Sequence, residues 1–248
     1  MQRALFASLF LLAASLAPAS EERVTFKSGT ETVAAFLVKP DGPGPFPAVI
    51  VFHEWWGLDD WIKDQTRALA KEGYAALAID FYRGKVTASE HEAHQLMMGA
   101  PTDRAIRDMK AGFSYLAARK DVARTRIGAV GWCMGGRNVF SLAAEEPTLA
   151  AAVIYYGAPP TDPATIAKIR APMLGNFGGD DEGPSPAQAK QFEAAAKRAG
   201  KTFDLKIYDG APHAFANPNN PWKGYRRDAA NDAWVRTTNF LRLFLRVK

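Results

Sequence analysis

Short apolar runs alternate with longer amphipathic stretches along most of this chain. Runs such as Ala48–Phe52 and Ala75–Ile79 are continuously apolar, which is typical of strands buried on both faces of a parallel sheet. Stretches such as Thr102–Ala118 repeat apolar residues at helical spacing. Because strands and helices alternate, we expect an α/β fold with a mostly parallel sheet covered by helices on both faces. The further predicted strands are Ile127–Val130, Ala151–Tyr155, Met173–Phe177 and Phe203–Tyr208, and the further predicted helices are Asp60–Lys71, Asn138–Glu145, Pro186–Arg198 and Tyr225–Leu245.

The first part of the sheet has a different pattern. Arg23–Lys27 alternates polar and apolar residues, and Glu31–Val38 starts polar and becomes apolar. The turn signal Ser28-Gly29-Thr30 lies between these segments, so they predict an antiparallel hairpin at one edge of the sheet. No linker divides residues 20–248, which we therefore interpret as a single domain.

Residues 1–19 have the pattern of a secretory signal peptide. Arg3 provides a positive start, residues 4–16 form an apolar core, and Ala17-Pro18-Ala19 is a small-x-small cleavage site. The alternative is a buried first helix. The pattern predicts that the mature protein is periplasmic or secreted.

Composition and charge exclude several classes of protein. The chain is 48% hydrophobic and 23% charged, which is ordinary for a globular protein and unlike a disordered one. Its net charge of +5 is not clustered, because basic and acidic residues are interleaved, and this pattern disfavours nucleic-acid binding. His91 and His94 have a spacing that suits zinc, but a third ligand is not evident. We expect a monomer with no metal, no cofactor, no nucleic-acid partner and no stable membrane association.

The strongest candidate for chemistry follows the predicted strand Ile127–Val130. Gly131-Trp132-Cys133-Met134-Gly135 reads G-x-C-x-G at a strand-to-helix turn, the nucleophile-elbow pattern with Cys in place of Ser. Bulky residues two positions before or after Cys133 would collide in so tight a turn, and the helix N-terminus favours a thiolate. One alternative is a phosphate-binding glycine loop, but its G-x-G-x-x-G spacing is absent here. The other is a small buried core residue, because the only Cys of the chain forms no internal disulfide.

A thiol nucleophile needs a base and a group that orients the base. His213 lies just after the predicted strand Phe203–Tyr208, and Asp180 and Asp181 follow the predicted strand Met173–Phe177. In elbow enzymes the acid lies between the nucleophile and the histidine along the chain, and sites lie at the carboxyl ends of parallel strands. The residues therefore predict a Cys–His–Asp arrangement in which either Asp is the acid. A structural or surface histidine is the alternative.

Other polar residues lie at the same predicted edge of the sheet. Glu54 stands at a strand end beside Trp55 and Trp56, and this loop is expected to supply one oxyanion donor. The alternative for Glu54 is a loop salt bridge, and we interpret His53 as structural. Arg83 follows another strand, where it either meets an anionic substrate or lies on the surface.

Five motifs together resemble the dienelactone hydrolase family of the α/β-hydrolase fold, and the resemblance covers nearly the whole chain after residue 23. The motifs are F-H-E-W-W-G at Phe52–Gly57, I-D-F-Y at Ile79–Tyr82, G-W-C-M-G-G at Gly131–Gly136, G-G-D-D at Gly178–Asp181 and H-A-F-A-N at His213–Asn217.

The resemblance implies roles for individual residues. It implies a triad of Cys133, Asp181 and His213, with Asp181 rather than Asp180 as the acid. It also implies that Glu54 contacts the resting thiol and helps to deprotonate it when substrate arrives. The remaining implied residues are the oxyanion donors Trp55 and Met134. We also predict that Arg83, Trp56 and Phe215 bind substrate.

The chain departs from the best-known members where they bind the substrate carboxylate with two arginines. Arg83 is offset by about one position from the first of them, and Asn217 stands in place of the second. We therefore predict a carboxylic ester hydrolase that cleaves a lactone or ester, as in carboxymethylenebutenolidase, through a thiol ester intermediate. The alternatives are an exported, non-catalytic binding protein with this fold, and a thioesterase or peptidase that uses the same triad.

Overall fold

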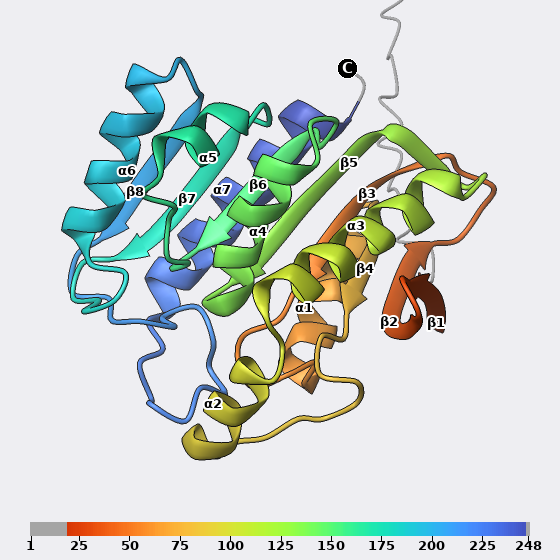
Figure 1. Cartoon of the computed structure of the whole chain (residues 1–248), viewed down its shortest axis with the longest axis horizontal. Coiled ribbons are helices and arrows are strands. Elements are labelled where there is room, and N and C mark those ends of the chain that lie inside the picture. The colour runs from red at the N-terminus through yellow and green to blue at the C-terminus, as the bar shows by residue number, and fades with distance from the viewer. Residues whose placement is uncertain (1–18, 247–248) are drawn as a thin grey trace, which may run out of the picture.

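An eight-stranded sheet forms the centre of the computed structural model, which describes residues 19–246 (Figure 1). The strand order is β1-β2-β4-β3-β5-β6-β7-β8. The strands are β1 (Ala19–Ser28), β2 (Glu31–Pro40), β3 (Phe46–Phe52), β4 (Ala75–Ile79), β5 (Val122–Trp132), β6 (Ala151–Tyr155), β7 (Met173–Gly178) and β8 (Phe203–Tyr208). β2 is antiparallel to both β1 and β4, and every pairing from β4 to β8 is parallel. The predicted parallel sheet with an antiparallel hairpin at its edge is confirmed.

Helices cover both faces of the sheet. In Figure 1, α3 (Thr102–Ala118) and α4 (Met134–Glu145) lie in front of the sheet, and α7 (Arg227–Leu245) lies behind it. The front layer also includes α5 (Pro163–Lys168) and α6 (Pro186–Arg198), and the back layer includes α1 (Asp60–Lys71). The remaining helix, α2 (Glu90–Met98), belongs to neither layer. It lies beyond the carboxyl ends of the strands, beside the loop that follows β8.

Alternate residues of each central strand pack into two separate cores. In β3, Ile50 and Phe52 join the core under α3 and α4, whereas Val49 and Val51 join the core under α1 and α7. Successive side chains of a strand point to opposite faces, so a strand covered on both faces must be apolar throughout. This requirement explains the continuous apolar runs that predicted the strands. No helix within residues 19–246 is long and apolar enough to cross a membrane.

Several elements differ from the prediction in their bounds. For α4 and for the additional helix α5 the reasons are local. α4 begins at Met134 rather than Asn138, because the chain enters the helix directly from the turn despite two glycines of low helix propensity in its first turn. The short helix α5 was not predicted. It is started by Asp162, which accepts hydrogen bonds from two backbone N–H groups, and by Pro163 at its first position.

The predicted signal peptide lies outside the described residues except for Ala19. The backbone of Ala19 pairs with that of Pro40 at the start of β1. Cleavage after Ala19 would therefore remove only the first residue of the strand.

Candidate active site

Cys133 occupies a strained turn between β5 and α4. Its φ of 54° lies in the left-handed region, which a residue with a side chain rarely adopts. A Cβ on Gly131 would overlap the carbonyl of Gly135, and one on Gly135 would overlap the carbonyl of Phe52. The turn therefore requires glycine two positions before and after the cysteine, as the elbow pattern predicts. Cys133 as a residue is of intermediate burial.

His213 and Asp181 come together from the loops after β8 and β7. Nδ1 of His213 lies 2.7 Å from Oδ2 of Asp181, and the other carboxylate oxygen accepts a hydrogen bond from the backbone N–H of Gly183 at 2.8 Å. The Asp181 side chain is 1% exposed. Asp180 is exposed and is tied into the loop through its backbone N–H, which donates to Ala211. The geometry pairs Asp181, rather than Asp180, with the imidazole.

The electrostatics of His213 favour its charged form. Burial acts to lower the pKa of His213, but hydrogen bonding and negative charge from Asp181 and Cys133 outweigh it and raise the pKa to about 10. His213 and Cys133 line the same cavity, so the charged imidazole is placed on the side of the site that carries the thiol. This arrangement suits a thiolate nucleophile that is paired with an imidazolium.

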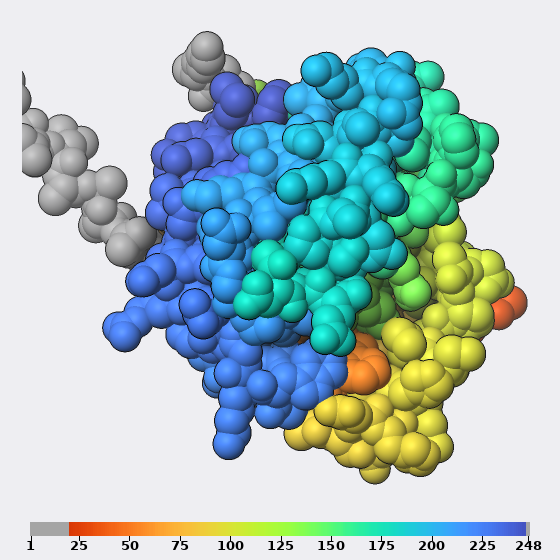
Figure 2. Space-filling view, turned by 90° about the vertical axis from the view of Figure 1, so that its left-hand side faces the viewer, coloured from red at the N-terminus to blue at the C-terminus, as the bar shows by residue number. Residues whose placement is uncertain are grey.

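A cavity of about 610 Å³ opens above these residues at the carboxyl edge of the sheet. In Figure 2 an orange segment between β3 and α1 lies between the yellow α2 and the blue loop after β8. The residues that line the cavity include Trp55, Met97, Cys133, Met134, Arg137, Tyr156, Asp181, His213 and Trp222. The predicted nucleophile, base and acid therefore share one concave and mainly apolar site.

Within the described part of the chain, two backbone N–H groups of the site segments have no backbone acceptor. Met134 is the first residue of α4, so its N–H has no acceptor within the helix. The N–H of Trp55 donates to no backbone carbonyl among residues 19–246. Gly135 packs against the carbonyls of Phe52 and His53, and this close approach brings the start of α4 next to the end of β3. The two donors are therefore placed on neighbouring segments, as an oxyanion hole requires.

Glu54 lies buried behind the cavity. It is 2% exposed, and its Oε2 accepts a hydrogen bond of 2.6 Å from the side-chain amide of Asn217. Burial raises the pKa of Glu54 to about 7, against the lowering effect of that hydrogen bond. The carboxyl group is therefore poised to gain or lose a proton near neutral pH.

Tyr156 is a site residue that the sequence analysis missed. It follows β6 directly with a φ of 38°, lines the cavity, and packs its ring at 5.1 Å from that of His213. Burial raises the pKa of its phenol well above the ordinary value, and the charges of Glu54 and Cys133 raise it further. Its position at a carboxyl strand end was the available signal.

His53 has a structural role in the loop that carries Glu54. It is fully buried, and its Nε2 accepts a hydrogen bond from the backbone N–H of Phe81 at 3.3 Å. Its Nδ1 then donates to the carbonyl of Glu54. Burial lowers the pKa of the ring, so the neutral imidazole joins the ends of β3 and β4.

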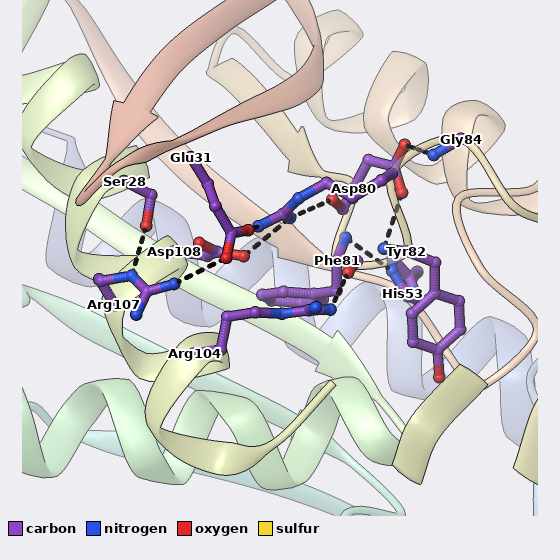
Figure 3. Close-up of polar contacts among 11 residues, drawn as sticks. Ser28, Glu31, His53, Asp80, Phe81, Tyr82, Gly84, Arg104, Arg107 and Asp108 are labelled. Atoms are coloured by element: carbon purple, nitrogen blue, oxygen red, sulfur yellow. Dashed lines mark hydrogen bonds and ion pairs between the residues drawn. The ribbon is translucent and has the colours of Figure 1, made fainter. Parts of the chain in front are cut away.

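Arg83 is not among the residues that line this cavity, so its predicted role in substrate binding finds no support in the structure. Its guanidinium pairs with Glu31 at 2.6 Å and with Asp108 at 2.8 Å. Figure 3 labels these two partners, which come from the hairpin and from α3. Asp108 is fully buried, and an unpaired buried carboxylate would be strongly destabilising. Arg83 therefore neutralises the Asp108 carboxylate and is not available to a substrate in the cavity.

Trp56 and Phe215, the other predicted substrate contacts, also lie behind the cavity wall. Phe215 is fully buried and packs against the rings of Tyr156 and Tyr208. Trp56 is 3% exposed and packs against Trp55 and Trp222. Both residues support the wall and do not touch the cavity space.

Trp222 forms part of the wall that the sequence analysis did not identify. It lies in the loop after β8, with its ring 5.5 Å from that of Trp55 and 5.8 Å from that of His213. Its indole N–H donates to Glu90 of α2. The loop after β8 and α2, which are far apart in the sequence, thus close one side of the site. A local sequence pattern cannot predict such a contact.

Comparisons with known proteins agree along almost the whole chain. A sequence model described as "Dienelactone hydrolase family" matches residues 33–245. The "Putative carboxymethylenebutenolidase" of Methylorubrum extorquens is 32% identical over 91% of this chain and 81% of its own length. The "Probable 2-oxo-3-(5-oxofuran-2-ylidene)propanoate lactonase" of a Bradyrhizobium species is 32% identical over 87% of this chain and 91% of its own length.

A solved structure has the same fold. The crystal structure of a "Putative Dienelactone Hydrolase" from Klebsiella pneumoniae superposes with a TM-score of 0.83 at 28% identity, covering 90% of this chain and 98% of that one. The sheet order and the helices on both faces are thus those of the α/β-hydrolase fold.

Proposed function

This chain belongs to the dienelactone hydrolase family, and we propose that it hydrolyses a carboxylic ester or lactone with Cys133 as the nucleophile. The observation that carries the proposal is the paired His213 and Asp181 beside an elbow cysteine in one cavity. Relatives described as a carboxymethylenebutenolidase and a lactonase support the choice of bond. We also propose that it acts as a monomer.

The first step forms a thiol ester. The Cys133 thiolate attacks the carbonyl carbon, a C–S bond forms, and the carbonyl electron pair moves to oxygen. The N–H groups of Trp55 and Met134 stabilise this oxyanion, and one such donor is typically worth about 100- to 1000-fold in rate. When the tetrahedral intermediate collapses, the C–O bond breaks and the leaving alkoxide takes a proton from the His213 imidazolium.

The second step releases the acid. His213, now neutral and oriented by Asp181, removes a proton from a water molecule that attacks the thiol ester carbonyl. The C–S bond breaks, and the thiolate and imidazolium are restored. This cycle is complete with side-chain and backbone groups of the chain and with water.

Glu54 is proposed to control the proton of the resting thiol. Its carboxyl group is buried near the site, and its pKa of about 7 allows proton exchange under ordinary conditions. It takes the thiol proton when substrate arrives, holds it during turnover, and returns it to the Cys133 thiolate after the acid has left, which restores the resting thiol. Glu54 is thus a positioning and proton-accepting residue and not the base for water.

A hydrolysis screen of aryl esters and lactones with the wild type and Cys133→Ala tests the proposal. We expect wild-type turnover of at least one class and a loss on the order of 10⁴-fold or more in the variant. Alkylation of the wild type with iodoacetamide, located by mass spectrometry, should abolish turnover with modification at Cys133. Full hydrolysis after complete alkylation would contradict the proposal. A folded wild type that binds these compounds without cleaving them would favour a non-catalytic binding protein.

We also propose that the protein is exported, with residues 1–19 as its signal peptide. The support is the sequence pattern of this segment together with the position of Ala19 at the first pairing of β1. Cleavage there leaves the sheet and the proposed site intact. The mature protein is then periplasmic or secreted.

A further inference from the structure

The cavity beside Cys133 contains a cation that the proposed mechanism does not use. Arg137 lies in the first turn of α4, where its backbone N–H donates to the carbonyl of Cys133 at 3.1 Å. This bond closes the first turn of α4 and places Arg137 one helical turn after Cys133. Arg137 is exposed, and it lines the cavity together with the cysteine.

Arg137 differs from the expected anion-binding residue in its ion pairs. Within residues 19–246, Arg137 forms no ion pair, whereas the expected anion-binding residue Arg83 forms two. The charge of Arg137 also reaches the base of the site. Burial and the charge of Cys133 raise the pKa of the Tyr82 phenol, and the charge of Arg137 opposes them. The Tyr82 hydroxyl contacts the sulfur of Met134 at 3.3 Å.

The charged residues that line the cavity are unevenly distributed. Its wall is mostly apolar and aromatic, with Trp55, Met97 and Trp222 among its members. The exposed carboxylates that line it, Asp180 and Glu182, both come from the loop after β7. An anionic group is therefore attracted to the α4 side of the cavity and repelled from the β7 side.

We propose that Arg137 determines specificity by binding a carboxylate carried on the substrate close to the scissile ester. This proposal rests on the proposed function. It assigns anion binding to Arg137 in place of Arg83. Arg137 is the fourth residue of α4, so it lies roughly one helical turn, about 5 Å along the axis, beyond the turn that carries Cys133. The carboxylate thus lies within about one arginine side chain of the carbonyl under attack. Suitable substrates are short-chain hemiesters of dicarboxylic acids, or lactones with an acidic substituent near the ring.

Matched substrates measure this selectivity directly. The 4-nitrophenyl monoester of glutaric acid carries a carboxylate, and 4-nitrophenyl valerate is its neutral counterpart of similar length. We expect Arg137→Gln to lower the ratio of kcat/KM values, anionic over neutral, on the order of tenfold, because a charged hydrogen bond at an exposed site is at the low end of its range. Most of the change should be in KM for the anionic ester. Arg137→Lys, which retains the charge, should restore part of the ratio.

The control variant is Lys110→Gln, which removes the same charge from an exposed position on α3 outside the residues that line the cavity. Its ratio should equal that of the wild type. An unchanged ratio in Arg137→Gln, or an equal fall in Lys110→Gln, would overturn the proposal.

A second assay separates this proposal from the proposed function, because it needs no ester hydrolysis. Cys133 is alkylated with iodoacetate or with iodoacetamide, and the ratio of the two rates cancels differences in thiol reactivity. We expect this ratio to fall several-fold in Arg137→Gln and to stay constant in Lys110→Gln. A falling ratio in a protein that cleaves no ester would support the anion subsite while refuting the esterase. A constant ratio in an active esterase would refute the subsite alone.

Discussion

Replacing Glu54 with Gln should stabilise the folded protein at alkaline pH and slow the enzyme. The side chain is buried, and its carboxylate accepts a hydrogen bond from the neutral amide of Asn217. Gln has nearly the same shape, and its carbonyl oxygen can accept that same hydrogen bond. The substitution therefore removes a buried charge without leaving the Asn217 amide unpaired.

The size and the sign of the effect follow from the pKa. Burial raises the pKa of Glu54 from 4.5 to about 7, and each unit corresponds to about 1.36 kcal/mol. The folded state therefore binds more protons than the unfolded state between pH 4.5 and about 7. The cost of the charged carboxylate is absent below pH 4.5, grows as the pH rises through this interval, and reaches about 3 kcal/mol above pH 7.

Denaturant unfolding of the wild type and Glu54→Gln across this range measures the effect. The two proteins should have the same free energy of unfolding below pH 4.5, and the variant should be more stable by about 3 kcal/mol above pH 8. The matched control is Glu193→Gln, the same substitution at an exposed position of α6, whose effect should be small throughout. The kcat for ester hydrolysis should fall in Glu54→Gln, because the proposed proton acceptor for the thiol is lost.

A stability difference that does not vary with pH would refute the reasoning. So would a variant less stable than the wild type at pH 8, because Glu54 would then stabilise the fold in its charged form. An unchanged kcat together with the expected stability profile would keep the electrostatic argument and remove Glu54 from the mechanism.

Three further predictions concern the nucleophile, its acid and the amino terminus. Asp181→Asn should lower kcat about 10⁴-fold, as loss of the orienting acid does in an analogous triad. Asp180→Asn should lower kcat less than about tenfold, because its side chain is exposed. If steady-state turnover shows the reverse order, the assignment of Asp181 as the orienting acid is wrong. Gly135→Ala should lower the free energy of unfolding by about 3 kcal/mol or more, since its Cβ would overlap the Phe52 carbonyl, and a wild-type midpoint in denaturant would contradict the close approach. Amino-terminal sequencing of protein from the native host should begin near Ser20, and an intact Met1 in a soluble cytoplasmic form would end the export proposal.

The sequence by itself determined most of the fold. α1, α3 and α6 occupy their predicted residues, as do β4, β6 and β8. These elements carry their signals locally. Both-face burial makes a central strand apolar throughout, and the start of α6 is marked by a capping box between Ser185 and Gln188.

The elbow at Cys133 was also predictable from sequence, because its requirement is local. The tight approach of backbone to backbone excludes a Cβ at Gly131 and Gly135, and the sequence shows this as a fixed spacing. The choice of Asp181 over Asp180 was different. Two adjacent carboxylates look alike along the chain, and only the family resemblance and the register of the loop after β7 separate them.

Only the tertiary structure decided which charged side chains face the cavity. Arg83 stands at a strand end, as a substrate-binding residue should, but the buried Asp108 of α3 holds its guanidinium away from the site. Arg137 lies four residues after the nucleophile with no such partner among the described residues. The direction of the Arg83 side chain depends on the buried Asp108 carboxylate with which its guanidinium pairs. Asp108 lies on α3, distant in sequence from Arg83. The direction of the arginine side chain is therefore decided only when α3 packs on the sheet.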